Sequence, residues 1–320
     1  MENFVNNKKK IVHIHWIGRF GNRMFQYAFG SFYANMFNMT YYIPSEWEGS
    51  LLFKPLDNVC IIPDDQLRLE LNQTQSSLNT HTYRCSAIDR YNKRQKDTSD
   101  IVIFDKEEQF GKPNIYFDNL DMMYYPWIFS KYSVSTIKSF FQFRDDIKSL
   151  PVYQYWFKRR GTYDAAHVRR GDIVTKHYNG AHSAISIASY HRAMKKNGID
   201  PKHVIWVSED HSIRTPSMWD IYLKDRWCYP IGQDRIPEIV FDFLPDFLTM
   251  IFARTLYRGN SSLSWWAAFL STGDVYSPVL QDRTKCNGSN YIDCTFVKGN
   301  YPHFMGNIKE GFHDIIFGQP

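Results

Sequence analysis

Several features that would assign a 320-residue chain to a common class are absent from this sequence. Its five cysteines form no Cys-x-x-Cys pair and no Cys/His array, which argues against a structural zinc site. No run of 18 apolar residues occurs, so a membrane-spanning helix is not expected. The start, MENFVNNKKK, lacks the apolar core of a secretory signal peptide. We therefore expect a cytoplasmic protein with reduced thiols, in which Cys286 and Cys294 pair only under oxidising conditions.

Common nucleotide-site motifs are absent as well. The chain has no Walker A motif, no complete G-x-G-x-x-G and no D-x-D. Enzymes that hold a sugar diphosphate through a divalent metal usually show carboxylates placed for that metal. Without them, positive charge for a diphosphate would come from arginines and helix N-termini, so we expect no metal. The net charge of +5 suits an anionic small ligand or a nucleic acid. The dense basic run Lys8–Lys10 reads as a solvated tail, so no nucleic-acid partner is predicted.

The clearest pattern that is present is an alternation of strand-like and helix-like segments from residue 164 onward. This alternation is typical of an α/β fold, in which helices cover both faces of a parallel sheet. The expected strands are 164–168, 203–208, 238–243 and, as the last one, 274–279, and the expected helices are 183–198, 245–257 and 263–271.

The first half of the chain also opens with a strand, a loop and a helix. Residues 11–18 read as a strand, GRFGN at 18–22 as a glycine loop and residues 23–37 as a helix. TYYIP at 40–44 and IVIF at 101–104 read as further strands, and residues 133–159 as mostly helical. A chain of this length accommodates two medium domains, which we place at 1–160 and 161–285.

Ligands of such sheets bind at the carboxyl ends of the strands. The residues that follow the expected strands are therefore the ones to inspect for a site. They are Gly18–Asn22, His167–Asp172, Ser208–Asp210, Leu244–Asp246 and Gly259–Ser262.

The run HVRRGD at 167–172 places two adjacent guanidiniums after a buried strand. They repel each other unless an anion or a carboxylate lies near. Because consecutive extended residues point opposite ways, one arginine can face a ligand while the other is anchored in the fold. We expect Arg170 to meet a phosphate and Arg169 to hold the turn. The alternative is a structural pair between an arginine and Asp172 on a surface turn.

Three other strand ends carry weaker signals. GNSS at 259–262 starts a helix, so its amides and the helix dipole suit an anion, and simple N-capping is the alternative. Glu209 and Asp210 can accept hydrogen bonds from a base or ribose, or can cap the next helix. GRFGN has the strand–loop–helix context of a ligand loop but little specificity alone. Trp265 and Trp266 are expected in the core.

Taken in order, HVRRGD, VSED and NSSLSWWAAFL resemble the motifs of the α-1,2-fucosyltransferases of glycosyltransferase family 11, and GNRMFQYAFG resembles that family's opening GNQMFQYA run. The likeness covers residues 14–30 and 165–271. Where the family usually reads GGLGNQ, this chain has GRFGNR, a form reminiscent of protein O-fucosyltransferases. The resemblance implies a GT-B fold, with two Rossmann-like domains and the active site in the cleft between them. Residues 1–160 would be the acceptor side, 161–285 the GDP-fucose domain, and 286–320 a segment returning to the first domain.

The resemblance also implies roles for individual residues. Arg170 would bind the diphosphate, His167 would lie near the nucleotide, and Asp172, Glu209 and His167 are the alternatives for the catalytic base. The remaining substrate-binding residues would be Arg19, Gly21 and Asn22 near the sugar, Arg169 at the strand end, Glu209 and Asp210 near the guanosine, and Asn260, Ser261 and Ser262 at the phosphate.

These features together predict an inverting, metal-independent fucosyltransferase. It would transfer L-fucose from GDP-β-L-fucose to a glycan hydroxyl, with an α-1,2 linkage to galactose, and would need no cofactor beyond its donor substrate. Two other functions remain open: a GT-B transferase with another donor or linkage, such as an O-fucosyltransferase-like enzyme, and a sugar- or nucleotide-binding protein without catalysis. The sequence leaves the acceptor and the oligomeric state open.

Overall fold

The chain forms two compact units, Met1–Phe143 and Arg144–Pro320. The computed structural model describes residues 10–16, 18–36, 38–45, 47–63, 65–67, 69, 81–84, 115–118, 133–175, 184–215, 243–279 and 291–300, and the following statements concern these residues. The division lies after residue 143, whereas the sequence led us to expect it after residue 160. Helices α8 (Asp145–Ser149) and α9 (Pro151–Lys158) belong to the second unit, where α9 packs against α13 (Leu244–Ile251).

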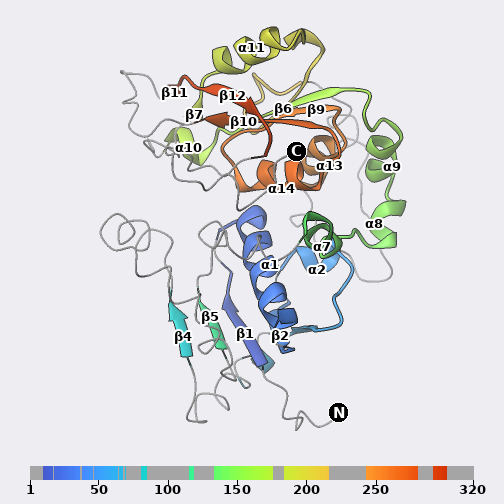
Figure 1. Ribbon diagram of the computed structural model, residues 1–320, viewed down its shortest axis with the longest axis vertical. Helices are drawn as coiled ribbons and strands as arrows, with labels where there is room; N and C mark the ends of the chain where they lie inside the picture. Colours follow the sequence, from blue (N-terminus) through green and yellow to red (C-terminus); the bar gives the residue numbers. More distant parts are fainter. Residues whose placement is uncertain are drawn as a thin grey trace. The chain divides into compact units, whose positions relative to one another are not determined.

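A parallel sheet is the centre of the first unit (Figure 1). Within the described ranges it has five strands in the order β3-β2-β1-β5-β4, and all neighbouring pairs are parallel. Helix α1 packs on β1 and β2, and its buried Tyr27 ring stacks on Trp47 at 3.9 Å between centroids. The elements of this unit are β1 (Lys10–His15), α1 (Phe20–Met36), β2 (Thr40–Pro44), α2 (Gly49–Leu52), β3 (Val59–Ile62), β4 (His81–Arg84), β5 (Ile115–Asp118) and α7 (Val134–Ser139).

The start of α1 differs from the expectation. The helix begins at Phe20, because the Arg19 carbonyl accepts hydrogen bonds from the amides of Asn22 and Arg23 at 2.9 and 3.2 Å. Gly21 and Asn22 therefore lie in the first turn of a helix, not in a loop. The strand β2 has the predicted bounds. The strand predicted at 101–104 lies outside the described residues.

A second five-stranded sheet is the centre of the other unit, in the order β12-β10-β9-β6-β8. Strands β8, β6, β9 and β10 are parallel, and β12 runs antiparallel to β10. Two short strands, β7 and β11, pair parallel to each other. Besides α8, α9 and α13, the elements are β6 (Asp164–Val168), α10 (Asp172–Thr175), β7 (Ala184–Ile185), α11 (Ile187–Lys196), β8 (Ile205–Ser208), β9 (Thr255–Tyr257), α14 (Ser262–Leu270), β10 (Asp274–Val279), β11 (Tyr291–Ile292) and β12 (Thr295–Lys298).

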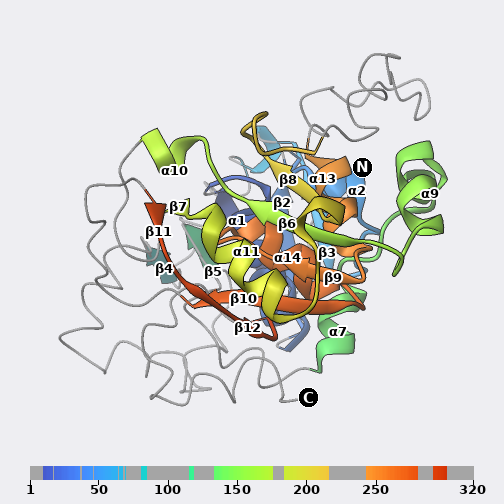
Figure 2. The same ribbon diagram turned by 90° about the horizontal axis from the view of Figure 1, so that it is seen from above.

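Helices cover both faces of this second sheet, as predicted. Figure 1 shows α11 on one face and α13 and α14 on the other, and in Figure 2, seen from above, α11 lies over the strands. Alternate residues of β6, Ala166 and Val168, pack with Tyr190 and Met194 of α11. Trp265 and Trp266 of α14 are buried in the core, as expected.

Two predicted helices in this unit are shorter than expected. The pattern at 245–257 was interpreted as one helix, but α13 ends at Ile251 and Thr255–Tyr257 is the strand β9. The apolar run continues across both elements because each is buried, so periodicity did not separate them. Helix α11 begins at Ile187 because the Ser186 hydroxyl accepts a hydrogen bond from the Ser189 amide at 3.2 Å. Strand β10 is as predicted but is not the last, since β12 follows it.

Candidate active site

Three of the candidate site segments meet at one edge of the second sheet. Strand β6 lies between β9 and β8, and Val168 pairs with Ser208 while Ala166 pairs with Tyr257. All three strands are parallel, so the residues that follow them come together. The loops concerned are 169–172, 209–210 and 258–262.

The segment Leu244–Asp246 was predicted to follow a strand at 238–243. That range lies outside the described residues, and Leu244–Asp246 forms the first turn of α13. Asp246 pairs with Arg214 at 2.5 Å, so its carboxylate has a structural partner.

Arg170 is a buried cation at this edge. It is only 4% exposed, and no described carboxylate lies within ion-pairing distance of it. Its Nη1 donates to the backbone oxygen of Arg169 at 3.0 Å, and its buried Nε has no hydrogen-bond partner. Burial lowers the pKa of the guanidinium, and the Asp210 carboxylate acts in the opposite direction. An orphaned, desolvated donor on a cation is costly, and an anion bound there would offset that cost.

Arg169 connects two of the loops. Its Nη1 donates to the backbone oxygen of Asn260 at 3.4 Å, from a half-buried position. This bond joins the end of β6 to the loop that starts α14. The two adjacent arginines therefore make different contacts, and the turn-holding role of Arg169 stays a prediction. The side chain of Asp172 lies outside the described residues, so its pairing with an arginine stays a prediction.

His167 is enclosed by cations. It is 8% exposed, and burial followed by the charges of Arg169 and Arg258 lowers its pKa to about 3. The imidazole is therefore neutral at physiological pH, and its buried Nδ1 has no hydrogen-bond partner. The Tyr190 hydroxyl donates to the backbone oxygen of His167 at 2.8 Å. A β-carbon at Gly259 would lie 2.9 Å from Nδ1, so only glycine allows the loop to approach this closely.

Arg258 is a fully buried guanidinium that sequence reasoning missed. Its Nε donates to the Ser277 hydroxyl at 2.8 Å, and its Nη1 donates to the backbone oxygen of Gly259 at 3.1 Å. Burial lowers its pKa to about 9, which leaves it cationic at neutral pH. The apolar pattern over 245–257 indicates one continuous helix, and it therefore conceals the strand end at Tyr257. The available signal was the β-branched and aromatic TLY directly before RGNSS.

The GNSS turn caps α14, as one of its two interpretations held. Ser261 is the N-cap, and its hydroxyl accepts a hydrogen bond from the Leu263 amide at 3.3 Å. The Ser264 hydroxyl donates to the backbone oxygens of Gly259 and Ser261, each at 3.1 Å. Asn260 and Ser261 are buried, and Ser262 is half-buried. The first-turn amides of a helix lack intrahelical acceptors, so this end of α14 also suits an anion.

The two carboxylates after β8 differ in their contacts. Glu209 is exposed, and a β-carbon at Gly171 would lie 2.4 Å from its Oε2. Gly171 has φ +58°, so glycine here serves both the turn and the close carboxylate. Asp210 caps its own turn, because its Oδ1 accepts hydrogen bonds from the Ser212 amide and hydroxyl at 2.9 and 2.6 Å. These bonds, the hydroxyl first, lower the pKa of Asp210.

The glycine turn before α1 belongs to the first unit. Gly18 has φ +71°, and a β-carbon there would lie 2.3 Å from the side-chain nitrogen of Asn22. Arg23 is held by the Gly18 carbonyl at 3.0 Å and by Glu48 at 2.9 Å. Arg19 is exposed beside them. The predicted roles of Arg19, Gly21 and Asn22 near the sugar stay predictions.

No family model matches the sequence, and no curated protein matches it either. Solved structures do. The fucosyltransferase NodZ from Bradyrhizobium matches with a TM-score of 0.53 and 14% identity, over 92% of this chain and 100% of that one. NodZ alpha-1,6-fucosyltransferase soaked with GDP-fucose matches at 0.50 and 16%, over 91% and 100%. The same enzyme co-crystallized with GDP matches at 0.51 and 15%, over 92% and 100%. This chain has the fold of NodZ. The predicted α/β, GT-B-like fold class is thereby confirmed.

The remaining predictions concern membranes, metals and thiols. No helix in the described ranges is both long and apolar enough to span a bilayer. Within the same ranges, no three His, Cys, Asp or Glu side chains are grouped as metal ligands, and metal independence stays a prediction. Cys294 is a free thiol whose pKa burial raises to about 12, and Cys286 lies outside the described residues.

Proposed function

We propose that this chain is an inverting, metal-independent fucosyltransferase. It transfers L-fucose from GDP-β-L-fucose to a glycan hydroxyl, with an α-1,2 linkage to galactose. The observation that carries the proposal is Arg170, a buried guanidinium with an unpartnered Nε at the end of β6, next to Arg169, which binds the loop before α14. The fold of NodZ supports it, as do the fucosyltransferase-like motifs that fall at the strand ends of the second sheet.

Charge development during the transfer explains why these residues suit the reaction. The acceptor oxygen forms a bond to the anomeric carbon of fucose while the bond from that carbon to the β-phosphate oxygen breaks. Both electrons of the broken bond leave with GDP, so negative charge grows on the β-phosphate. Arg170 and the amides at the start of α14 supply positive charge where it develops. Arg258 and Arg169 hold the backbone oxygens of Gly259 and Asn260, which orients the loop that presents those amides.

The acceptor hydroxyl loses a proton in the same step, and a base assists its removal. His167 fits this task poorly, because a pKa near 3 leaves its imidazole with little affinity for a proton. Glu209 is an exposed carboxylate next to Gly171, at the same strand ends. We therefore assign the base to Glu209 and place His167 near the nucleotide as a neutral imidazole. Asp172 stays the alternative base.

A turnover assay tests the function directly. The protein is incubated with GDP-fucose, EDTA and either lactose, a type-1 or type-2 disaccharide, or a galactose-free acceptor with a free 6-hydroxyl, and GDP release is measured. We expect turnover with the galactose-containing acceptors. GDP binding without release with any acceptor would favour a non-catalytic binding protein. Turnover only with the 6-hydroxyl acceptor would overturn the linkage, and loss of activity in EDTA would overturn metal independence.

Substitutions of the two adjacent arginines test the phosphate assignment. Arg170→Ala should lose about 10²-fold or more in turnover, the size expected for a transition-state donor. Arg170→Lys keeps the charge without the fork and should recover only part of it. Arg169→Ala is the matched control and should lose much less. Near-wild-type turnover and GDP-fucose affinity in Arg170→Ala would show that the phosphate binds elsewhere.

A further inference from the structure

Tyr291 lies over the guanidinium of Arg170. The Cζ atom of Arg170 is 4.6 Å from the centroid of the Tyr291 ring. Tyr291 is 41% exposed, whereas Arg170 is 4% exposed. The ring therefore lies over the buried cation, while the residue as a whole is partly exposed. Aromatic faces attract a guanidinium placed in this way, and more strongly where water is excluded from the cation.

The strand that carries Tyr291 makes few backbone contacts. Strand β11 has two residues, and Tyr291 pairs with Ala184 and Ile292 with Ile185 of β7. The Ser186 amide donates to the backbone oxygen of Ile292 at 2.9 Å. Such a short ladder holds a strand weakly, so the side-chain contacts of the residues that follow it matter.

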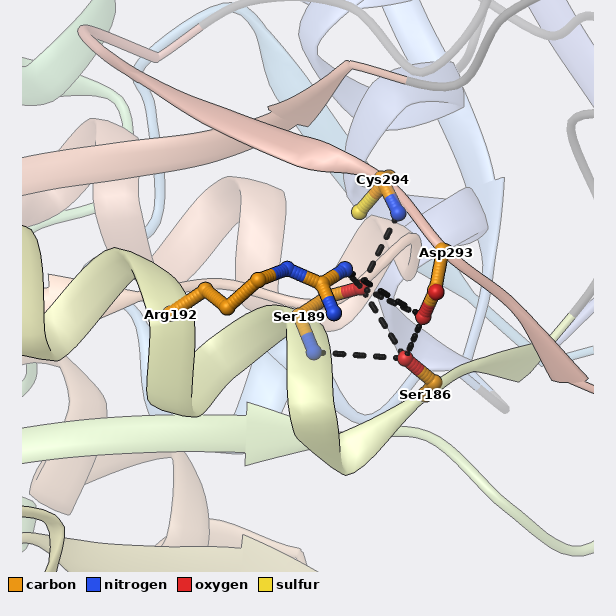
Figure 3. Close-up of polar contacts among 5 residues, drawn as sticks. All are labelled: Ser186, Ser189, Arg192, Asp293 and Cys294. Carbon is orange, nitrogen blue, oxygen red and sulfur yellow. Dashed lines mark hydrogen bonds and ion pairs between the residues drawn. The ribbon is translucent and has the colours of Figure 1, made fainter.

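Asp293, directly after β11, ties this strand to the start of α11 (Figure 3). Its carboxylate accepts hydrogen bonds from the hydroxyls of Ser186 and Ser189, the latter at 3.3 Å, and pairs with Arg192 at 3.3 Å. The Cys294 amide donates to the Ser189 hydroxyl at 2.9 Å. The bond from Ser186, followed by the contacts with Arg192, lowers the pKa of Asp293, so the tie is ionised at neutral pH.

The guanidinium of Arg170 needs such a support. Its hydrogen bond to its own chain neighbour, from Nη1 to the Arg169 oxygen, fixes one corner of the planar group. The buried Nε has no hydrogen-bond partner. A guanidinium binds a phosphate through two parallel hydrogen bonds only if its plane is oriented correctly. The Tyr291 ring supplies a surface against which that plane can rest.

We propose that Tyr291 is a positioning residue for Arg170, and that Asp293 keeps it in place through the start of α11. The proposal rests on the proposed function, since it assumes that Arg170 binds the diphosphate of the donor. Tyr291 restricts the plane of the guanidinium so that its unpartnered Nε edge is presented to the anion. This assigns a role to residues 291–294, which lie more than 100 positions after HVRRGD.

Affinity for GDP, measured by calorimetry, tests the inference. Tyr291→Phe retains the ring and should bind GDP like the wild type. Tyr291→Leu retains apolar bulk without the π face and should weaken binding about 5–30-fold. Asp293→Asn should weaken it less, in the same direction. Tyr155→Leu is the matched control, because it removes a similar stacking of Tyr155 on Arg159, at 5.0 Å, and should leave GDP affinity unchanged.

A second background separates positioning from general damage. In Arg170→Gln the cation is gone, so adding Tyr291→Leu should change GDP affinity less than about twofold, because the two effects are coupled. If Tyr291→Leu lowered GDP affinity equally in the wild-type and Arg170→Gln backgrounds, or did not lower it in the wild type, this inference would be wrong and the proposed function would stand. A wild-type protein that binds no GDP would overturn the proposed function, and this inference with it. If Tyr291→Leu does not fold, Asp293→Asn carries the same test with Tyr291→Phe as its reference.

Discussion

Replacement of Gly171 by alanine tests whether the position of the Glu209 carboxylate matters to the reaction. Gly171 has φ +58°, where a β-carbon costs about 1–2 kcal/mol, partly offset by about 0.4–1 kcal/mol because alanine restricts the unfolded chain. The net loss of stability should be about 1 kcal/mol. The new β-carbon would also lie 2.4 Å from Glu209 Oε2. The carboxylate therefore has to retreat by about 1 Å to reach van der Waals distance.

Gly198 provides the matched control. It has φ +70°, and a β-carbon there meets nothing within 4 Å. Gly198→Ala should therefore lose a similar stability, measured by denaturant unfolding, without a change in turnover. A misplacement of about 1 Å at a reacting group can cost 10²-fold, so Gly171→Ala should lose about 10–100-fold in kcat for GDP-fucose. Equal kcat values in the two variants would refute the idea that Glu209 acts on the acceptor.

Three further predictions concern the buried groups at the same strand ends. His167 takes up a proton near pH 6.5 in the unfolded chain and only near pH 3 in the folded protein. The stability that the neutral His167 contributes is therefore complete above pH 6.5 and is lost as the pH falls towards 3. The free energy of unfolding should fall by up to about 1.4 kcal/mol per pH unit over that range. His167→Asn should flatten the unfolding free energy over that range, and an unchanged slope would contradict the assignment. Arg258→Met should weaken GDP binding at least about tenfold, because it removes a positive charge from the site. The loss of stability should be small, because a desolvated charge is removed and the Gly259 oxygen keeps its hydrogen bond from Ser264. Unchanged GDP affinity, measured by calorimetry, would disprove this prediction. In Gly259→Ala the new β-carbon would lie 2.8 Å from the His167 backbone oxygen, and this variant should have a lower affinity for GDP. In Gly273→Ala the β-carbon would lie 2.3 Å from a backbone oxygen away from these strand ends. This second variant should have a lower free energy of unfolding, and the protein that folds should bind GDP with unchanged affinity.

The sequence predicted the parts of the fold whose signals are local. The strand DAAHV at 164–168 has the bounds that its buried run indicated, and TYYIP at 40–44 does as well. The alternation of strands and helices indicated a parallel sheet covered on both faces, which the second unit shows. These features depend on residues close together in the chain. Periodicity and turn residues therefore report them.

Local signals failed where two buried elements followed each other. Residues 245–257 present one continuous apolar pattern, but it covers a helix and a strand that are both buried. The strand Thr255–Tyr257 exists because it pairs with β6 on one side and β10 on the other. Pairing of that kind is a property of the assembled sheet, and no local pattern contains it. Because this strand was not predicted, Arg258, which directly follows it, was not predicted as a site residue either.

HVRRGD and GNSS could be recognised as candidate site segments from the sequence, because strand ends and helix starts are local features that favour anions. The sequence by itself therefore determined the α/β class and the chemical character of the site. Only the tertiary structure decided which groups surround Arg170. The contact with Tyr291, the proximity of His167 to Arg258 and the approach of Glu209 to Gly171 all join residues far apart in the chain. Such contacts depend on the order of the strands and on the packing of the helices. These are properties of the whole folded chain, and no local sequence pattern indicates them.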